Sequence, residues 1–172
     1  MTIVFCLGDQ YAPYGIFGEM RLRKDLEFQC VEGELSRSVL NELSALNESL
    51  FRLGETSDAL ERFFGACRDL VFVLCRSNGI LVGFKIGMYL QDCVFESWRG
   101  GVHPTFRRLG IARTLMHMQH DWCRAHGYHL IQTVTNQENV PMISLNQTMG
   151  FSLVRIFVNE HGRTKILQRN ML

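Results

Sequence analysis

The stretch from Gly100 to Ala112 has the residue pattern in this chain that is best suited to binding an anion. A predicted strand ends at His103, because Pro104 has no N–H to donate to a strand ladder. A helical pattern begins a few residues later, and its first backbone N–H groups have no partner inside the helix, so they attract negative charge together with the helix dipole. Gly110 lets a phosphate approach without a Cβ in the way, and Arg107 or Arg108 can add positive charge. The pattern predicts a phosphate site at a strand-to-helix turn, although taken alone it also fits an ordinary turn.

A second segment supports the phosphate site. Asn139 begins a short helical pattern that ends at Gly150-Phe151. Together the two segments resemble the GNAT superfamily of acyl-CoA N-acyltransferases. The pyrophosphate loop of that family reads Arg or Gln, two residues, Gly, one residue, then Gly or Ala, shortly after a strand that ends in Val-x-Pro. Residues 102–112 match both parts, the strong match covers residues 92–158, and the order of elements is compatible from about Glu27.

The resemblance implies a site for CoA, with acetyl-CoA as co-substrate and no metal. The pyrophosphate would lie against the backbone amides of Arg107, Arg108, Leu109, Gly110, Ile111 and Ala112. The pantetheine arm would lie where the strand ending at Val102 diverges from the strand at residues 131–135. It would pair with the backbone of Gly101, Val102 and His103, where an N–H would polarise the acyl carbonyl. Asn139 would contact this arm, cap its own helix, or do both.

The resemblance also points to acid–base candidates. Glu96 lies six residues before Val102, where some family members place a general base, and the apolar side chains beside it would raise its pKa. The alternatives are a water chain as base and a plain solvent-facing glutamate. His103 is a second base candidate, or simply a histidine at a strand end. Asn146 stands where the family commonly has a tyrosine acid, so the acid is unassigned: either water protonates the thiolate, or CoA leaves as a thiolate, since thiol pKa values are roughly 8–9.

The predicted reaction is transfer of an acetyl group from acetyl-CoA to a primary amine by direct attack in a ternary complex, because no cysteine lies in the matched motif. Acceptor recognition would come from the first two helices and the loop at residues 51–57. There Glu55 and Asp58 could meet a cationic amine or simply be solvated. Trp98 and Tyr89 could line the cleft or belong to the core. The acceptor is a small molecule or a peptide amine, and the choice among small amine, amino acid, aminoglycoside and protein N-terminus stays open.

Two other classes of function compete with this enzyme. A non-catalytic acyl-CoA-binding sensor or scaffold of the same fold is supported by the missing tyrosine at Asn146. A nucleotide-phosphate binder of another fold would follow if the match from Asn139 to Phe151 were chance. Loss of turnover without loss of CoA affinity on Glu96→Gln would favour the enzyme, and tight ATP binding beside weak CoA binding would favour the third class.

Composition fits one globular domain over residues 1–172, with residues 92–158 as the CoA-binding and catalytic core and 1–26 as an N-terminal extension without a clear pattern. Hydrophobic residues make up 47% and charged residues 20%, and the net charge is +1, so we expect neither a nucleic-acid nor a membrane partner. The apolar start is too short for a signal peptide, which predicts a cytoplasmic protein. The resemblance also allows a homodimer. We expect the six scattered cysteines to be free thiols and His117 and His120 to be surface or cleft residues.

The elements that must position these residues follow from hydrophobic periodicity. Helical patterns cover residues 35–51, from about 57 to 67, 109–126 and 139–149. Strand patterns cover residues 27–32, 70–76, 80–90, 92–103, 128–135, 151–158 and 163–169, and Asn78-Gly79 signals a hairpin turn. This order predicts an α/β layered fold, and the resemblance specifies a mixed, mostly antiparallel central sheet flanked by helices.

Overall fold

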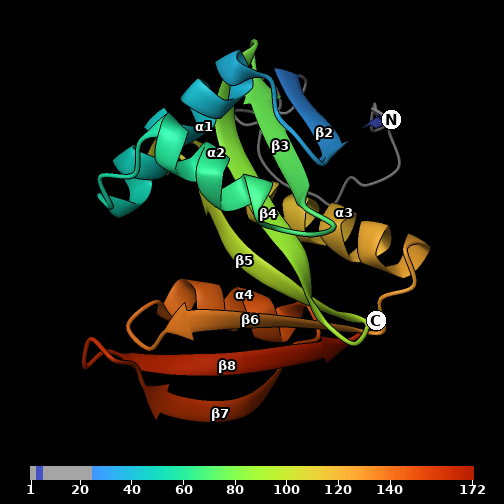
Figure 1. Cartoon of the computed structure of the whole chain (residues 1–172), viewed down its shortest axis with the longest axis vertical. Coiled ribbons are helices and arrows are strands. Elements are labelled where there is room, and N and C mark those ends of the chain that lie inside the picture. Colours follow the sequence, from blue (N-terminus) through green and yellow to red (C-terminus); the bar gives the residue numbers. More distant parts are fainter. Residues whose placement is uncertain (1–2, 6–24) are drawn as a thin grey trace, which may run out of the picture.

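The computed structural model describes residues 3–5 and 25–172, which form one eight-stranded sheet with helices on both faces (Figure 1). The strand order is β1-β2-β3-β4-β5-β6-β8-β7, and β5–β6 is the parallel pair in an otherwise antiparallel sheet. The strands are β1 (Ile3–Phe5), β2 (Leu26–Glu32), β3 (Val71–Ser77), β4 (Ile80–Gln91), β5 (Val94–Val102), β6 (Leu130–Asn136), β7 (Ser152–Val158) and β8 (Thr164–Met171). The helices are α1 (Arg37–Phe51), α2 (Ser57–Gly65), α3 (Ile111–Ala125) and α4 (Val140–Thr148). The predicted fold class is confirmed.

The β3–β4 hairpin forms the centre of the sheet. Its turn places Asn78 at φ 49° and Gly79 at φ 78°, the left-handed pair that a two-residue hairpin with the strands' twist requires. Successive residues of β3 point to opposite faces, and both faces are covered: Phe72 and Leu74 pack with α1 and α2, while Val73 packs with α3. This double cover explains why β3 is apolar from Val71 to Cys75 rather than alternating.

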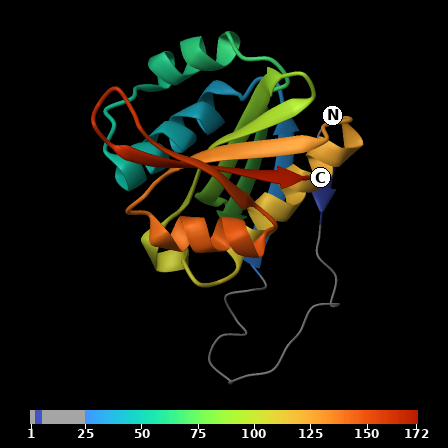
Figure 2. The same cartoon turned by 90° about the horizontal axis from the view of Figure 1, so that it is seen from below.

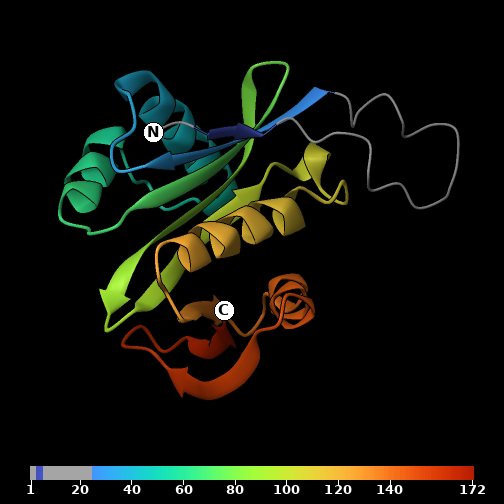
Figure 3. The same ribbon diagram turned by 90° about the vertical axis from the view of Figure 1, so that its right-hand side faces the viewer.

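Helices α1 and α2 lie on one face of the sheet and α3 lies on the other (Figure 3). Helix α2 begins at Ser57, and the Thr56 side chain caps it by accepting a hydrogen bond from the Ala59 N–H. Phe63 is 42% exposed, and its ring packs on Trp98. The apolar face of α2 is therefore narrower than its sequence suggests.

Strands β6, β8 and β7 form the far end of the sheet. Helix α4 lies along one face of this part (Figure 2), where Asn146 reaches Thr135 of β6 and Gln168 of β8. In the described part of the chain no helix covers the opposite face, which is the face that α1 and α2 cover further along the sheet (Figure 3). We call the uncovered side of β6, β8 and β7 the bare face.

Some sequence predictions meet a different outcome. His120 is only 2% exposed and packs on the Phe151 ring, so the expectation of a surface or cleft residue is wrong for it. Cys30, Cys67, Cys75, Cys93 and Cys123 are free thiols as expected, whereas Cys6 lies outside the described residues. The predicted N-terminal extension also falls mostly outside them. None of the described helices combines the length and the apolar character that crossing a membrane demands.

Candidate active site

An opening between β5 and β6 forms the centre of the candidate site. The two strands pair only from Val94 to Glu96, against Leu130 to Gln132. A bulge explains why β5 turns away: Ile86 of β4 pairs with Arg99 while Met88 pairs with Glu96, so two residues, Ser97 and Trp98, oppose one. Beyond the bulge β5 runs on to Val102 without a partner strand on this side, as the family resemblance implied.

The unpaired edge of β5 presents backbone groups to this opening. The His103 N–H donates to the Val82 carbonyl at 2.8 Å, so His103 bonds toward β4. Because successive residues of a strand bond to alternate sides, the N–H groups of Gly100 and Val102 point toward the opening. Gly101 must be small because a Cβ there would lie 2.5 Å from the Leu50 side chain of α1. An extended ligand could therefore pair with this edge as an additional strand would.

The phosphate loop lies at the far end of the opening from Glu96. After a short 3₁₀ turn at Pro104–Phe106, Gly110 takes φ 82° and precedes the first turn of α3. No side chain caps α3, and in residues 3–5 and 25–172 no backbone carbonyl accepts from the N–H groups of residues 108–110. The first N–H groups of α3 also have no partner within the helix. This loop therefore holds several free donors at the positive end of a 15-residue helix.

Side-chain contacts hold this loop against the sheet. The Nε of Arg107 donates to the Val102 carbonyl at 3.1 Å, which ties the loop to the end of β5. His103 Nδ1 lies 2.8 Å from Thr105 Oγ1. Ile111 is buried against β3 and β4, and Leu109 and Ala112 pack beside it. Arg108 is exposed and has φ 69°, so its side chain is free to meet an anion.

Glu96 lies at the near end of the opening, next to the bulge. Its Oε2 accepts a hydrogen bond from Gln132 Nε2 of β6 at 2.9 Å. Burial raises the pKa of Glu96 above its usual range, and the Gln132 bond and the nearby Lys85 ammonium oppose that rise. A carboxylate with a raised pKa at the edge of an opening is suited to accept a proton.

Glu96 and His103 are not brought together. They are seven residues apart on one strand, so at about 3.3 Å per residue they are separated by roughly 20 Å. Only one of them can touch a given reacting amine. His103 lines a separate small depression between α1 and β4.

Asn139 and Asn146 both lie on α4 but differ in their surroundings. Asn139 is exposed and caps α4, since its side chain accepts from the Met142 N–H at 3.3 Å. Asn146 is 0% exposed, and its Nδ2 donates to Gln168 Oε1 at 2.8 Å. Its Oδ1 is buried and has no hydrogen-bond partner among the residues that the structure describes. The structure thus places Asn146 inside the α4–sheet core, away from Glu96.

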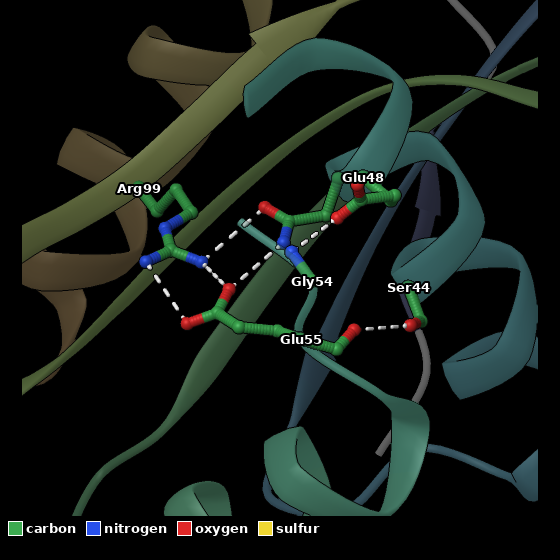
Figure 4. A network of polar contacts seen from close by, with 6 residues as sticks. Ser44, Glu48, Gly54, Glu55 and Arg99 are labelled. Carbon is green, nitrogen blue, oxygen red and sulfur yellow. Dashed lines mark hydrogen bonds and ion pairs between the residues drawn. The ribbon is translucent and has the colours of Figure 1, made fainter. Parts of the chain in front are cut away.

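A polar network holds the α1–α2 loop against β5 (Figure 4). The Arg99 guanidinium forms an ion pair with Glu55, and their side chains are 17% and 32% exposed. Asn47 Nδ2 donates to Glu55 Oε2 at 3.0 Å, and the Ser44 hydroxyl donates to the Glu55 carbonyl at 3.0 Å. Glu55 is therefore already paired rather than free for a cationic amine, and Asp58 is paired with Arg37. The loop expected to recognise the acceptor is anchored by its own acidic residue.

Aromatic residues complete this side of the site. The Arg99 guanidinium lies 4.0 Å from the centre of the Trp98 ring, which packs in turn on Phe63 and Phe64. Trp98 therefore bridges the α2 core and the network. Tyr89 lies with the α3 core and carries the Arg68 guanidinium over its ring.

The comparisons with known proteins agree with this geometry. The model of the acetyltransferase (GNAT) family matches residues 40–151. The chain therefore belongs to the GNAT family of acetyltransferases, enzymes that use acetyl-CoA as the acetyl donor. No curated protein sequence matches it.

Solved structures of the same fold are distant in sequence. The ribosomal-protein-S18-alanine N-acetyltransferase from Escherichia coli has a TM-score of 0.69 at 16% identity, over 83% of this chain and 93% of that one. Ard1 from Thermoplasma volcanium has a TM-score of 0.72 at 15% identity, over 83% and 97%. The protein yncA from Salmonella typhimurium, determined with acetyl-CoA, has a TM-score of 0.68 at 15% identity, over 83% and 94%. At these identities the likeness establishes the fold alone.

Three side chains near Glu96 were not found from the sequence. Gln132 reaches Glu96, and Arg169 reaches Gln132, only through the register of β5, β6 and β8, and no local motif indicates that register. Lys85 is 5% exposed, and burial lowers its pKa to about 8. Its strand pattern is compatible with an ordinary surface lysine, so burial was not predictable.

Proposed function

We propose that this protein transfers an acetyl group from acetyl-CoA to a primary amine by direct attack in a ternary complex. The observation that carries the proposal is the opening between β5 and β6, with free loop amides at one end and a half-buried carboxylate at the other. These are the two things the reaction needs: an anion site for the donor and a proton acceptor for the amine.

In this proposal the residues have distinct roles. Backbone N–H groups from Arg107 to Ala112 bind the pyrophosphate, and the free edge of β5 pairs with the pantetheine arm. This placement brings the thioester near the bulge at Ser97–Trp98 rather than at Gly101–His103, because only the bulge adjoins Glu96. Glu96 takes the proton from the acceptor amine, and an N–H of the β5 edge stabilises the oxyanion that forms on the acyl carbonyl.

The leaving thiolate receives no proton donor from this chain in the proposal. Asn146 is buried and bonded to Gln168, so its amide only supports α4. The alternative of a non-catalytic CoA-binding module depended on the absence of a tyrosine at this position. Because a CoA thiolate is a moderate base, with a pKa of roughly 8–9, it can leave without an acid.

The direct test is turnover with purified protein. The protein is incubated with acetyl-CoA and a panel of primary amines. Release of free thiol is measured by a colorimetric assay, and the mass of the acceptor is measured by mass spectrometry. The proposal predicts amine-dependent thiol release together with an acetylated amine. Tight acetyl-CoA binding without release in the presence of any amine would favour the non-catalytic module, and tight ATP binding beside weak CoA binding would point to a nucleotide site.

A further inference from the structure

A row of polar residues crosses four strands next to the proposed base. The register pairs Glu96 with Gln132, Gln132 with Arg169, and Arg169 with Ser152. Residues that pair directly across a sheet share one face, and for Gln132, Arg169 and Ser152 this is the bare face. We call these four residues the polar row. It begins at the proposed base and leads away from the CoA opening, across a surface that no helix covers in the described part of the chain.

Charges fix the direction of the hydrogen bonds along this row. Gln132 donates through Nε2 to Glu96 at 2.9 Å and accepts through Oε1 from Arg169 Nε at 3.1 Å. A carboxylate can only accept and a guanidinium can only donate, so this amide orientation satisfies both neighbours and the flipped one satisfies neither. Arg169 therefore stands at a fixed place relative to Glu96.

The two terminal nitrogens of Arg169 form no hydrogen bond with the residues that the structure describes. Among the residues that the structure describes, the bond to Gln132 is its one side-chain hydrogen bond and it forms no ion pair. The residue is half-buried and borders an open depression of about 500 Å³, lined by Leu130, Gly150, Ser152, Arg169, Asn170 and Met171. A guanidinium held beside a depression with two nitrogens free presents the fork that binds a carboxylate.

The surrounding charge favours the same ligand. Strands β6, β7 and β8 contain Arg155, Lys165 and Arg169 and no aspartate or glutamate. By register all three cations lie on the bare face. A polycationic amine would be repelled here, whereas a molecule with one amine and one carboxylate matches Glu96 at one end and Arg169 at the other.

We propose that the acceptor is a small amino acid whose carboxylate is bound by Arg169 while its amine meets Glu96. This rests on the proposed function and narrows its substrate class. The two bonds to Gln132, with about 2.2 Å across the amide itself, put Glu96 Oε2 and Arg169 Nε no more than about 8 Å apart. The terminal nitrogens of Arg169 lie about 2.3 Å beyond Nε, so a hydrogen bond of about 3 Å at each end leaves at most about 4–5 Å between amine and carboxylate, which suits an α-amino acid and not a long spacer.

The test compares matched acceptors at saturating acetyl-CoA. Each common amino acid is assayed as the free acid, as its carboxamide and as the decarboxylated amine. For the best acceptor we expect kcat/KM to be at least about tenfold higher for the free acid. Arg169→Gln should lower the free-acid value by about tenfold or more and leave the carboxamide value nearly unchanged. Arg163→Gln, the same change in the exposed β7–β8 turn, should keep the preference.

Several outcomes would overturn the inference. Equal rates with all three forms would do so, and so would a larger rate with a peptide amide whose second residue is acidic. If Arg169→Gln slows every acceptor equally and moves the acid limb of the pH profile, Arg169 acts only by orienting Gln132. Turnover without a carboxylate preference removes this inference alone, whereas absence of thiol release with every amine removes the proposed function and this inference with it.

Discussion

The donor and acceptor sides of the candidate site are built from different parts of the polypeptide. On the donor side the loop at residues 107–112 and the edge of β5 offer backbone N–H groups, and glycines make room for them. On the acceptor side Glu96, Gln132, Arg169 and the Arg99–Glu55 network offer side chains. A site made of backbone N–H groups depends on the local backbone conformation, which many different side chains allow. The binding properties of a site made of side chains change whenever one of those residues is substituted. The comparison implies that the donor is common to the family and that the acceptor is particular to this chain.

The largest expected effect separates chemistry from donor binding. Glu96→Gln removes the proposed proton acceptor and keeps the shape of the side chain, so kcat should fall by about 100-fold or more while the Kd for acetyl-CoA changes little. Steady-state kinetics and titration calorimetry on the same preparation measure both. Glu160→Gln in the exposed β7–β8 turn is the control. An unchanged kcat would move the base elsewhere and break the assignment of the acceptor side.

The second effect concerns the stability of the folded protein and the buried residue Lys85. Lys85 is buried with a pKa of about 8 instead of 10.5, so its charged form destabilises the folded state. Lys85→Met should raise the free energy of unfolding at pH 7 by on the order of 3 kcal/mol, at about 1.4 kcal/mol per pKa unit. Wild type regains stability as pH rises from about 8 to 10.5, because only the unfolded chain holds the proton there, so the difference should shrink over that range. Urea unfolding at several pH values checks this, and a constant difference would contradict it.

A smaller effect is expected in the acceptor loop. Glu55→Gln leaves Arg99 without its ion pair in a mostly buried place, and the free energy of unfolding should fall by about 1–2 kcal/mol, since both groups keep some solvent. The acceptor KM should rise severalfold as the loop loosens, and the acetyl-CoA Kd should not move. Asp58→Asn, which breaks the exposed pair with Arg37, should affect neither constant. A change in acetyl-CoA affinity on Glu55→Gln would show that the two sides are not independent.

The smallest effect is a shift in a pH profile. The Gln132 bond lowers the pKa of Glu96 from the value that burial alone would give. Gln132→Leu should therefore raise that pKa and move the acid limb of kcat/KM to higher pH, because the base must be unprotonated to act. The pH profile of kcat/KM is measured for the variant and the wild type with an amine acceptor that contains no other ionisable group. A shift to lower pH would mean that the group that titrates is not Glu96.

The same division explains what the sequence could predict. The strand-to-helix turn before α3 and the Asn78-Gly79 turn depend on backbone conformations that particular residue types favour locally, so both turns were predicted correctly, whereas the role of Arg107–Ala112 as a CoA site stays a prediction. The tie between Glu55 and Arg99 joins positions 44 residues apart, and the polar row depends on the register of a parallel pair and on a bulge. His120 appeared polar and exposed, yet it is buried beside Phe151, where burial lowers its pKa to about 4 and keeps it neutral. Such contacts arise only when distant segments pack.

The most direct test of the account is titration of the protein with acetyl-CoA, beside two matched glycine variants. Gly110→Glu and Gly162→Glu both put a glutamate at a glycine of positive φ, 82° and 70°, with open space for a Cβ. They share the strain and the charge, and only Gly110 adjoins the proposed pyrophosphate site. We expect micromolar binding for the wild type and Gly162→Glu, and an affinity at least about 100-fold weaker for Gly110→Glu, since a carboxylate at that point repels the pyrophosphate. Equal binding by both variants, or no binding by the wild type, would contradict the central claim that this loop holds CoA.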